Sequence, residues 1–282
     1  NLKKNRTKIL EKFENFKNYN IMLEDIESLT KIFDHEKPNY VVHLAAQAGV
    51  RYSISNPDIY FQSNMLGFFN MIELSRLNKI KHFIYASSSS VYGSSNKYPL
   101  DENLSTSKPI NFYGATKKSN EIISYSYASV YNLPVTGLRF FTVYGPFGRP
   151  DMSLFKFTEK ILNNKKIDIY NNGNHIRDFT YIDDVCEIIK RLILSKNKKK
   201  YHQFFNICSN NPLNLSKIIN QINKLTFKKP KIFKRSLQKA DVIKTHGSNK
   251  KILSKIGKMK FTKIEIGLEK TLDWFKKYYN FY

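Results

Sequence analysis

The sequence has 282 residues and is 41% hydrophobic, so it is long and apolar enough for a folded protein with a sizeable core, and intrinsic disorder is excluded. Its formal net charge of +24 raises the question of a polyanionic partner such as a nucleic acid. Lysine, however, is spread over nearly the whole sequence, and no nucleic-acid-binding module accompanies it. We therefore expect no nucleic-acid partner and interpret the charge as a compositional bias.

Cysteine usage and hydropathy exclude further classes. Cys186 and Cys208 are the only cysteines and lack metal-ligand spacing, so we expect neither a disulfide framework nor a metal site. No apolar run approaches the roughly 20 residues of a membrane span, so no membrane partner is expected. Because the sequence starts at Asn1 without an initiator Met, the expected cytoplasmic location rests on the chemistry below.

Along the first half of the chain, apolar stretches of strand length alternate with segments of helical periodicity. Strands are predicted at 18–26, 38–47, 81–93 and 133–146. Helices are predicted at 1–17, 57–77 and 112–132. This alternation predicts an α/β fold with a doubly wound parallel sheet that helices cover on both faces.

Beyond Gly148 the elements become shorter. We predict helices at 153–162 and 262–280, strands at 167–173 and 204–209, and a loop leading into a helix at 177–194. The expected division is a main domain at 1–147 and a smaller C-terminal α+β lobe at 148–282, some of whose segments return to the main sheet.

A glycine-rich turn is missing from the sequence. A doubly wound nucleotide-binding fold normally starts with a strand, such a turn and a helix whose N-terminus holds pyrophosphate. No G-x-x-G-x-x-G occurs in the 282 residues. We therefore expect a Rossmann-like domain that is N-terminally truncated, without its first strand, Gly-rich loop and second strand.

Tyr113 and Lys117 lie four residues apart on a predicted helix, so both side chains leave the same face. A nearby ammonium favours the phenolate, and such a tyrosine can accept a hydroxyl proton while the adjoining carbon gives up hydride. Spacing alone favours a surface pair, because the chain contains 18 tyrosines and abundant lysine. The serine-ended strand about 25 residues upstream supports the catalytic interpretation.

Five motifs in order resemble the extended short-chain dehydrogenase/reductase family of NAD-dependent epimerases and dehydratases. They are HLAAQAGVRYS, YASSSSVYG, FYGATKKSNE, LRFFTVYGPFGRPDM and RDFTYIDD. The match spans essentially residues 1–282 and is especially similar to bacterial UDP-glucuronate 4-epimerases. It implies NAD as cofactor, a UDP-sugar as substrate, and about 40 further N-terminal residues that carry the Gly-rich loop.

The resemblance implies a role for each matching residue. The catalytic residues are the triad hydroxyl, the base and the lysine that lowers its pKa, namely Ser88, Tyr113 and Lys117. The NAD contacts are Asp25, Ile26, Ala45, Ala46, Gln47 and Asn64, together with Tyr113 and Lys117. The substrate contacts are Ser89, Ser90, Thr142, Arg149, Arg177 and Asp241.

Some of these positions have alternative interpretations. Arg149 and Arg177 suit the diphosphate because a guanidinium binds phosphate oxygens in pairs. An ion pair with Asp178 is the alternative for Arg177. Arg51 is a candidate for the active-site entrance or a dimer edge, and His43 for a buried core histidine.

The residues after the triad hydroxyl discriminate between related reactions. In this family, dehydratases carry an Asp-Glu pair there and decarboxylases a Glu in the second place, whereas this chain has Ser89 and Ser90. We therefore expect redox-neutral epimerisation at C4, from UDP-glucuronate to UDP-galacturonate through a 4-keto intermediate. The alternatives are a UDP-hexose 4-epimerase, a UDP-glucuronate decarboxylase and an inactive nucleotide-sugar-binding fragment.

The two long predicted helices, 57–77 and 112–132, carry more apolar residues than one buried face needs. Relatives pair these helices as a four-helix interface. A homodimer is therefore expected.

Overall fold

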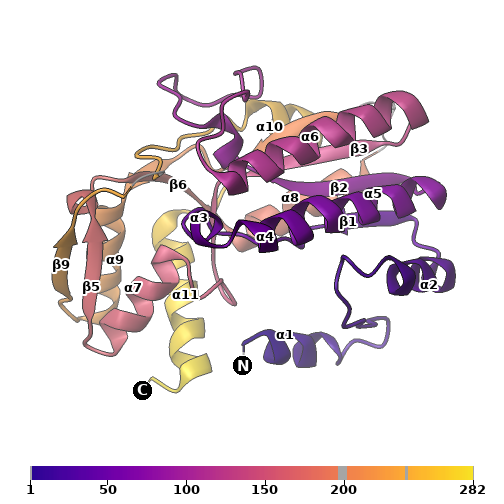
Figure 1. Ribbon diagram of the computed structural model, residues 1–282. Helices are drawn as coiled ribbons and strands as arrows, with labels where there is room; N and C mark the ends of the chain where they lie inside the picture. The colour runs from indigo at the N-terminus through magenta and orange to yellow at the C-terminus, as the bar shows by residue number, and fades with distance from the viewer. Residues whose placement is uncertain (1, 196–201, 239–240, 282) are drawn as a thin grey trace.

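Four parallel strands form the central sheet of the protein (Figure 1). The computed structural model describes residues 2–195, 202–238 and 241–281. In sheet order the strands are β1 (Tyr40–His43), β2 (His82–Ser88), β3 (Val135–Phe140) and β7 (Gln203–Ile207). Most of their residues are buried, as expected for a parallel sheet enclosed on both sides.

Helices cover both faces of this sheet, which confirms the predicted α/β class. One face carries α4 (Pro57–Tyr60), the π-helical turn η1 (Phe61–Leu66), α5 (Gly67–Leu77) and α6 (Phe112–Tyr131). On this face Phe68 and Ile72 of α5 pack against Phe83 of β2. The opposite face carries α8 (Ile182–Leu194) and α10 (Lys250–Ile256), where Ile188 and Ile252 pack against the sheet.

The N-terminal segment corrects one prediction. Residues 2–10 form the helix α1 (Leu2–Leu10), but the strand predicted at 18–26 is wrong. Leu23 packs against the central core, and its carbonyl accepts a hydrogen bond from the Asn70 side chain at 2.9 Å. The backbone there is therefore held by a side chain of α5, and α2 (Ile26–Glu36) follows.

A second group of elements surrounds its own core, at the left of Figure 1. Its strands are β4 (Thr142–Tyr144), β6 (Ile176–Tyr181) and β8 (Pro212–Asn214), in the order β4-β6-β8, and the pair β5 (Lys166–Tyr170) and β9 (Lys231–Arg235). Its helices are α7 (Ser153–Leu162), α9 (Leu215–Thr226) and α11 (Ile264–Tyr279).

Strand β6 replaces the loop predicted before the helix at 177–194, because it pairs with β4 on one side and β8 on the other. Strand β7 and helices α8 and α10 lie in the layers of the central sheet, although they come late in the sequence. The domain boundary at residue 147 stays a prediction.

Short helical segments complete the structure: α3 (Tyr52–Ser55), and the 3-10 turns η2 (Ser89–Tyr92) and η3 (Asn171–Gly173). Among the helices that the structure describes, none combines the length and apolarity needed to cross a membrane. In the same part of the chain, no group of three or more His, Cys, Asp or Glu side chains is placed to hold a metal ion.

Candidate active site

The carboxyl end of β2 meets the N-terminus of α6, and this contact brings the three predicted catalytic residues together. Ser88 ends β2, close enough to Tyr113 in the first turn of α6 that its side chain lowers the pKa of the phenol through a hydrogen bond. One turn later, the Lys117 ammonium donates to the carbonyl of Ala86 at 2.9 Å. Ser88 and Lys117 are buried and Tyr113 is half-buried.

The local sequence explains why α6 begins so close to the end of β2. Asn111 caps the helix by accepting a hydrogen bond from the Gly114 amide at 2.8 Å. A Cβ at Gly114 would lie 2.8 Å from the carbonyl oxygen of Ser90, so only glycine permits this approach. The first turn of α6 therefore rests on the serine turn η2.

Burial shifts the pKa values of Tyr113 and Lys117 in opposite directions. Burial raises the pKa of Tyr113, while the Ser88 hydrogen bond and the charge of Arg149 lower it. Burial also lowers the pKa of Lys117 to about 8. The ammonium of Lys117 is directed to the Ala86 carbonyl, and its predicted effect on the pKa of Tyr113 stays a prediction.

Asn64, predicted as an NAD contact, is fully engaged with the protein. Its amide oxygen accepts from the Gln47 backbone N–H at 2.8 Å, and its amide nitrogen donates to the Gln47 carbonyl at 3.0 Å and to Thr116 at 3.1 Å. The side chain is buried in the π-helical turn η1, a type of distortion that is frequent at functional sites. Asn64 thus ties the loop after β1, which contains Ala45 and Ala46, to α6.

Asp25 and Ile26 lie at the start of α2. Asp25 caps this helix by accepting from the Ser28 amide at 3.0 Å, and this contact lowers the pKa of the carboxyl. Ile26 is 42% exposed. Their predicted contact with adenine stays a prediction.

The predicted substrate residues Arg177 and Asp241 lie in one charged cluster of the second lobe, together with Arg51. Arg51 forms a two-pronged ion pair with Asp241, with its Nη2 2.7 Å from Oδ2, and stacks on the Tyr170 ring. His175 lies 3.8 Å from the same carboxylate. Asp241 is thus held by a residue that comes from the loop after β1.

Arg177 makes no ion pair with Asp178, so that alternative is wrong. Its guanidinium donates to the carbonyls of Ile176 and Ile243 at 2.9 and 3.0 Å. Burial, with Arg51 nearby, lowers its pKa to about 10 despite the opposing effect of Asp241. Asp178 instead accepts from Ser209 and from the Gly247 amide, which leaves Arg177 with charge that no carboxylate neutralises by direct contact among the described residues.

The remaining predicted substrate residues lie in the turn η2 and in the segment 142–149. Thr142 begins β4, and with Arg149 it lines a pocket beside α7. The exposed Arg149 pairs with Asp151, at 3.0 Å from Nε to Oδ1. Ser89 and Ser90 form the first turn of η2, where the Ser90 amide donates to the Ser88 hydroxyl at 3.1 Å.

Two buried residues next to this site were not predicted from the sequence. Glu121 of α6 and Arg139 of β3 form an ion pair, at 2.8 Å from Nε to Oε1. The signals were the spacing of Glu121, four residues after Lys117, and an arginine in an otherwise apolar strand.

Comparisons with known proteins identify the family of the chain. The NAD dependent epimerase/dehydratase family matches residues 2–208. Protein CapI of Staphylococcus aureus is 44% identical over 99% of this chain and 87% of its own length. The UDP-glucuronate 4-epimerase of Thermodesulfobacterium geofontis is 38% identical, over 95% of this chain and 82% of its own length.

Among solved structures, the UDP-glucuronic acid 4-epimerase of Bacillus cereus, in complex with UDP-glucuronic acid and NAD, superposes with a TM-score of 0.92. It is 28% identical, and the match covers 99% of this chain and 87% of that protein. The chain therefore belongs to the NAD dependent epimerase/dehydratase family.

Proposed function

We propose that this chain is a UDP-sugar 4-epimerase whose substrate is UDP-glucuronate and whose product is UDP-galacturonate. The observation that carries the proposal is the contact of Ser88 with Tyr113 beside two uncharged residues, Ser89 and Ser90. Dehydration and deprotonation at C5 need an acid and a base at those positions, whereas epimerisation needs only one proton acceptor. The names of the relatives point to the same reaction.

The residues of the site fit NAD. The ammonium of Lys117 is buried and has three donor positions, of which the hydrogen bonds among the described residues use one, to Ala86. The other two suit the hydroxyls of a nicotinamide ribose. When bound, NAD accepts hydride from C4 of the sugar and returns it.

The protein side chains then transfer the proton of the 4-hydroxyl and hold the carboxylate of the sugar. Ser88 orients the 4-hydroxyl, and Tyr113 accepts its proton and later gives it back to the 4-keto oxygen. The 4-keto form of glucuronate is a β-keto acid that readily loses CO₂. We assign Ser89, Ser90 and Thr142 to the sugar carboxylate, because hydroxyls that fix its orientation suppress that loss.

The charged cluster of the second lobe suits the nucleotide. We assign Arg177 and Arg149 to the diphosphate, since both guanidinium groups have unused donors among the described contacts. Asp241 is assigned to the ribose hydroxyls of uridine. The ribose would then replace Arg51 at the Asp241 carboxylate, or bind the carboxylate together with Arg51. The cytoplasm, which contains NAD and nucleotide sugars, is the proposed location.

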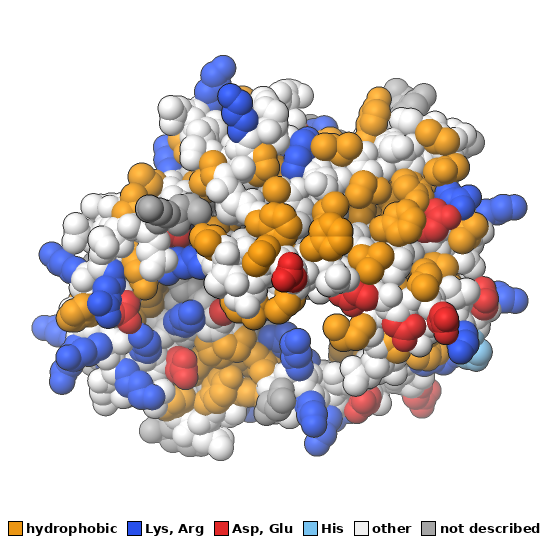
Figure 2. Space-filling model, viewed as in Figure 1, with side chains coloured by type: hydrophobic (Ala, Val, Ile, Leu, Met, Phe, Trp, Pro, Cys, Tyr) orange, Lys and Arg blue, Asp and Glu red, His pale blue; other side chains and the backbone are white. Residues whose placement is uncertain are grey.

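We also propose a homodimer through α4, α5 and α6. Figure 2 shows apolar side chains gathered over these helices. Phe61 and Phe69 are 54% and 44% exposed, and Ile122 and Tyr125 of α6 are 60% and 64% exposed. Exposed apolar side chains that gather on one face in this way favour a protein–protein interface.

The test is to incubate the full-length protein with NAD and UDP-glucuronate and to identify the product by NMR. UDP-galacturonate is expected. A UDP-4-keto-pentose would make the protein a decarboxylase instead. Turnover restricted to UDP-glucose would make it a hexose epimerase, and NAD binding without any turnover would leave only a binding function.

A further inference from the structure

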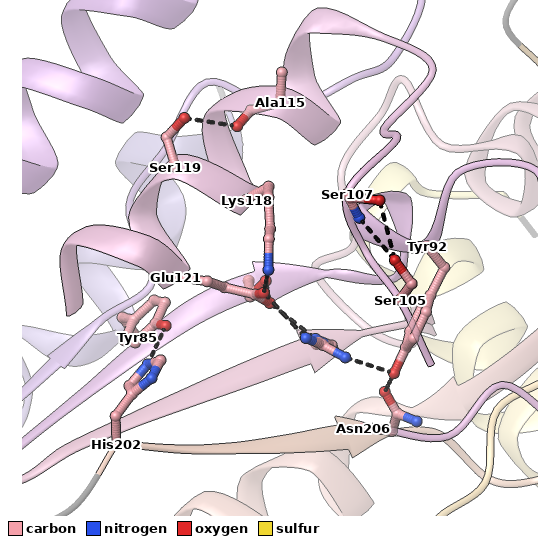
Figure 3. Close-up of polar contacts among 12 residues, drawn as sticks. Tyr85, Tyr92, Ser105, Ser107, Ala115, Lys118, Ser119, Glu121, His202 and Asn206 are labelled. Atoms are coloured by element: carbon pink, nitrogen blue, oxygen red, sulfur yellow. Dashed lines mark hydrogen bonds and ion pairs between the residues drawn. The ribbon is translucent and has the colours of Figure 1, made fainter. Parts of the chain in front are cut away.

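Glu121 and Arg139 form a buried ion pair that the proposed mechanism does not use. The Glu121 carboxylate accepts from Arg139 with both oxygens, at 2.8 Å from Nε and 3.0 Å from Nη2. The two side chains are 0% and 2% exposed. Glu121 also accepts from the Ser87 hydroxyl at 2.7 Å. Its carboxylate lies 3.4 Å from the Lys118 ammonium (Figure 3).

The pair joins the two elements that carry the proposed catalytic residues. On α6, Tyr113, Lys117 and Glu121 follow at steps of four residues and therefore share one helix face. On β2, Ser87 donates to Glu121 and directly precedes Ser88. The carboxylate thus fixes the distance between the serine strand and the tyrosine helix.

Arg139 extends this connection across the sheet. Ser87, Arg139 and Asn206 lie opposite one another on β2, β3 and β7. Arg139 donates to the Tyr92 hydroxyl at 2.9 Å. That hydroxyl donates to Asn206 at 2.7 Å (Figure 3). Tyr92 ends the turn η2 that starts just after Ser88, so the network also fixes this turn.

Stability alone does not account for this arrangement. Two charges lose their hydration when they are buried, and apolar residues of similar volume often stabilise a protein equally well. The ion pair instead fixes geometry, because each of its hydrogen bonds sets the distance between a catalytic element and the element beside it. A displacement of about 1 Å in an active site lowers turnover by up to roughly 100-fold.

We propose that Glu121 and Arg139 are positioning residues that keep Tyr113 beside Ser88 and preserve the hydrogen bond from Lys117 to Ala86. They do not touch the substrate and act through α6 and β2. This inference rests on the proposed function of Tyr113 as the proton acceptor.

The test uses the double variant Glu121→Leu/Arg139→Met, which removes both charges at similar volume and so avoids a lone buried charge. We expect kcat to fall roughly 10- to 100-fold, with KM and the calorimetric affinity for UDP within about twofold. The acid limb of the kcat–pH profile moves to higher pH, because Tyr113 loses the full effect of Ser88. The matched control is Glu187→Leu/Arg191→Met, a partly exposed pair on α8 at 2.7 Å, which should leave all four readouts unchanged.

A double variant with the kcat and pH profile of the unaltered protein would overturn the inference. Should it fail to fold, Ser87→Ala removes only the link to the strand, and we expect kcat to fall roughly threefold to tenfold at constant KM. Unchanged kcat in Ser87→Ala would then overturn the inference.

Failure of the proposed function is a separate outcome, seen as no turnover of any UDP-sugar by the unaltered protein. The positioning role is then judged from a crystal structure of the double variant. Loss of the hydrogen bond from Lys117 to Ala86 supports it, and its retention together with the Ser88–Tyr113 contact overturns it.

Discussion

Two arginine–carboxylate pairs connect parts of this protein that are separate in sequence, and they differ in burial. Arg139 and Glu121 are 2% and 0% exposed, and both take part in a network of hydrogen bonds with other side chains. Arg51 and Asp241 are 44% and 11% exposed, and they connect the loop after β1 to the second lobe. Neither member of the first pair can reach water without a rearrangement of the core, whereas the second pair is open to solvent and, as we propose, can exchange Arg51 for a ligand. The same kind of ion pair therefore fixes geometry at one place and, in the proposed function, gives way to the nucleotide at the other.

Tyr113→Phe gives the largest expected effect, because it removes the proton acceptor that the buried pair holds in place. We expect kcat to fall roughly 10²- to 10⁴-fold. The unfolding temperature and the affinity for UDP should stay close to those of the unaltered protein. If Tyr113→Phe keeps most of its turnover, Tyr113 is not the proton acceptor, and the Glu121–Arg139 network has no catalytic residue to position.

The free energy of unfolding separates the two pairs directly. Arg139→Ala leaves the Glu121 carboxylate buried without its partner and should cost about 3–5 kcal/mol. Arg51→Ala should cost at most about 1 kcal/mol, because that pair is partly exposed and Asp241 regains water. Denaturant titration of both variants measures the difference. Equal losses would contradict the distinction drawn between the pairs.

The buried Lys117 makes the free energy of unfolding depend on pH. Its pKa is about 8 in the folded protein and about 10.5 when unfolded, so between these values the unfolded chain binds the additional proton. Stability should therefore rise with pH across this window, by about 3 kcal/mol from this group. Lys117→Met should lack this component when unfolding is measured from pH 7 to 10.5. An identical pH dependence in both proteins would show that the ammonium is hydrated.

Asp241→Asn gives the smallest expected effect and tests the exchangeable pair. The loss of a charged acceptor should weaken UDP binding roughly tenfold, as measured by calorimetry, with little change in kcat. Arg51→Met is the matched variant, which removes the competing partner and should not weaken binding. Tighter binding in Asp241→Asn would contradict the assignment of Asp241 to the ribose.

The sequence predicted the features that depend on local spacing. The parallel sheet follows from alternating apolar strands and helices, and Tyr113 and Lys117 are recognisable because they share a helix face near a serine-ended strand. Glu121 and Arg139 were missed because their pairing depends on how α6 packs on β3. The strand predicted at 18–26 and the loop predicted before the helix at 177–194 were wrong because both depend on tertiary contacts. Leu23 is apolar because it packs against the core, although it belongs to no sheet. The start of β6 is polar and is therefore typical of a loop, but backbone carbonyl groups accept hydrogen bonds from Arg177 and make a strand possible there.

The most direct test of the central claim uses UDP-glucuronate that carries deuterium at C4. In the proposed reaction the hydride that leaves C4 returns to C4, while Tyr113 handles only the hydroxyl proton. After incubation with the full-length protein and NAD, NMR should show UDP-galacturonate with the deuterium still on C4. A product with protium at C4, or a pentose without the carboxyl carbon, would contradict the account.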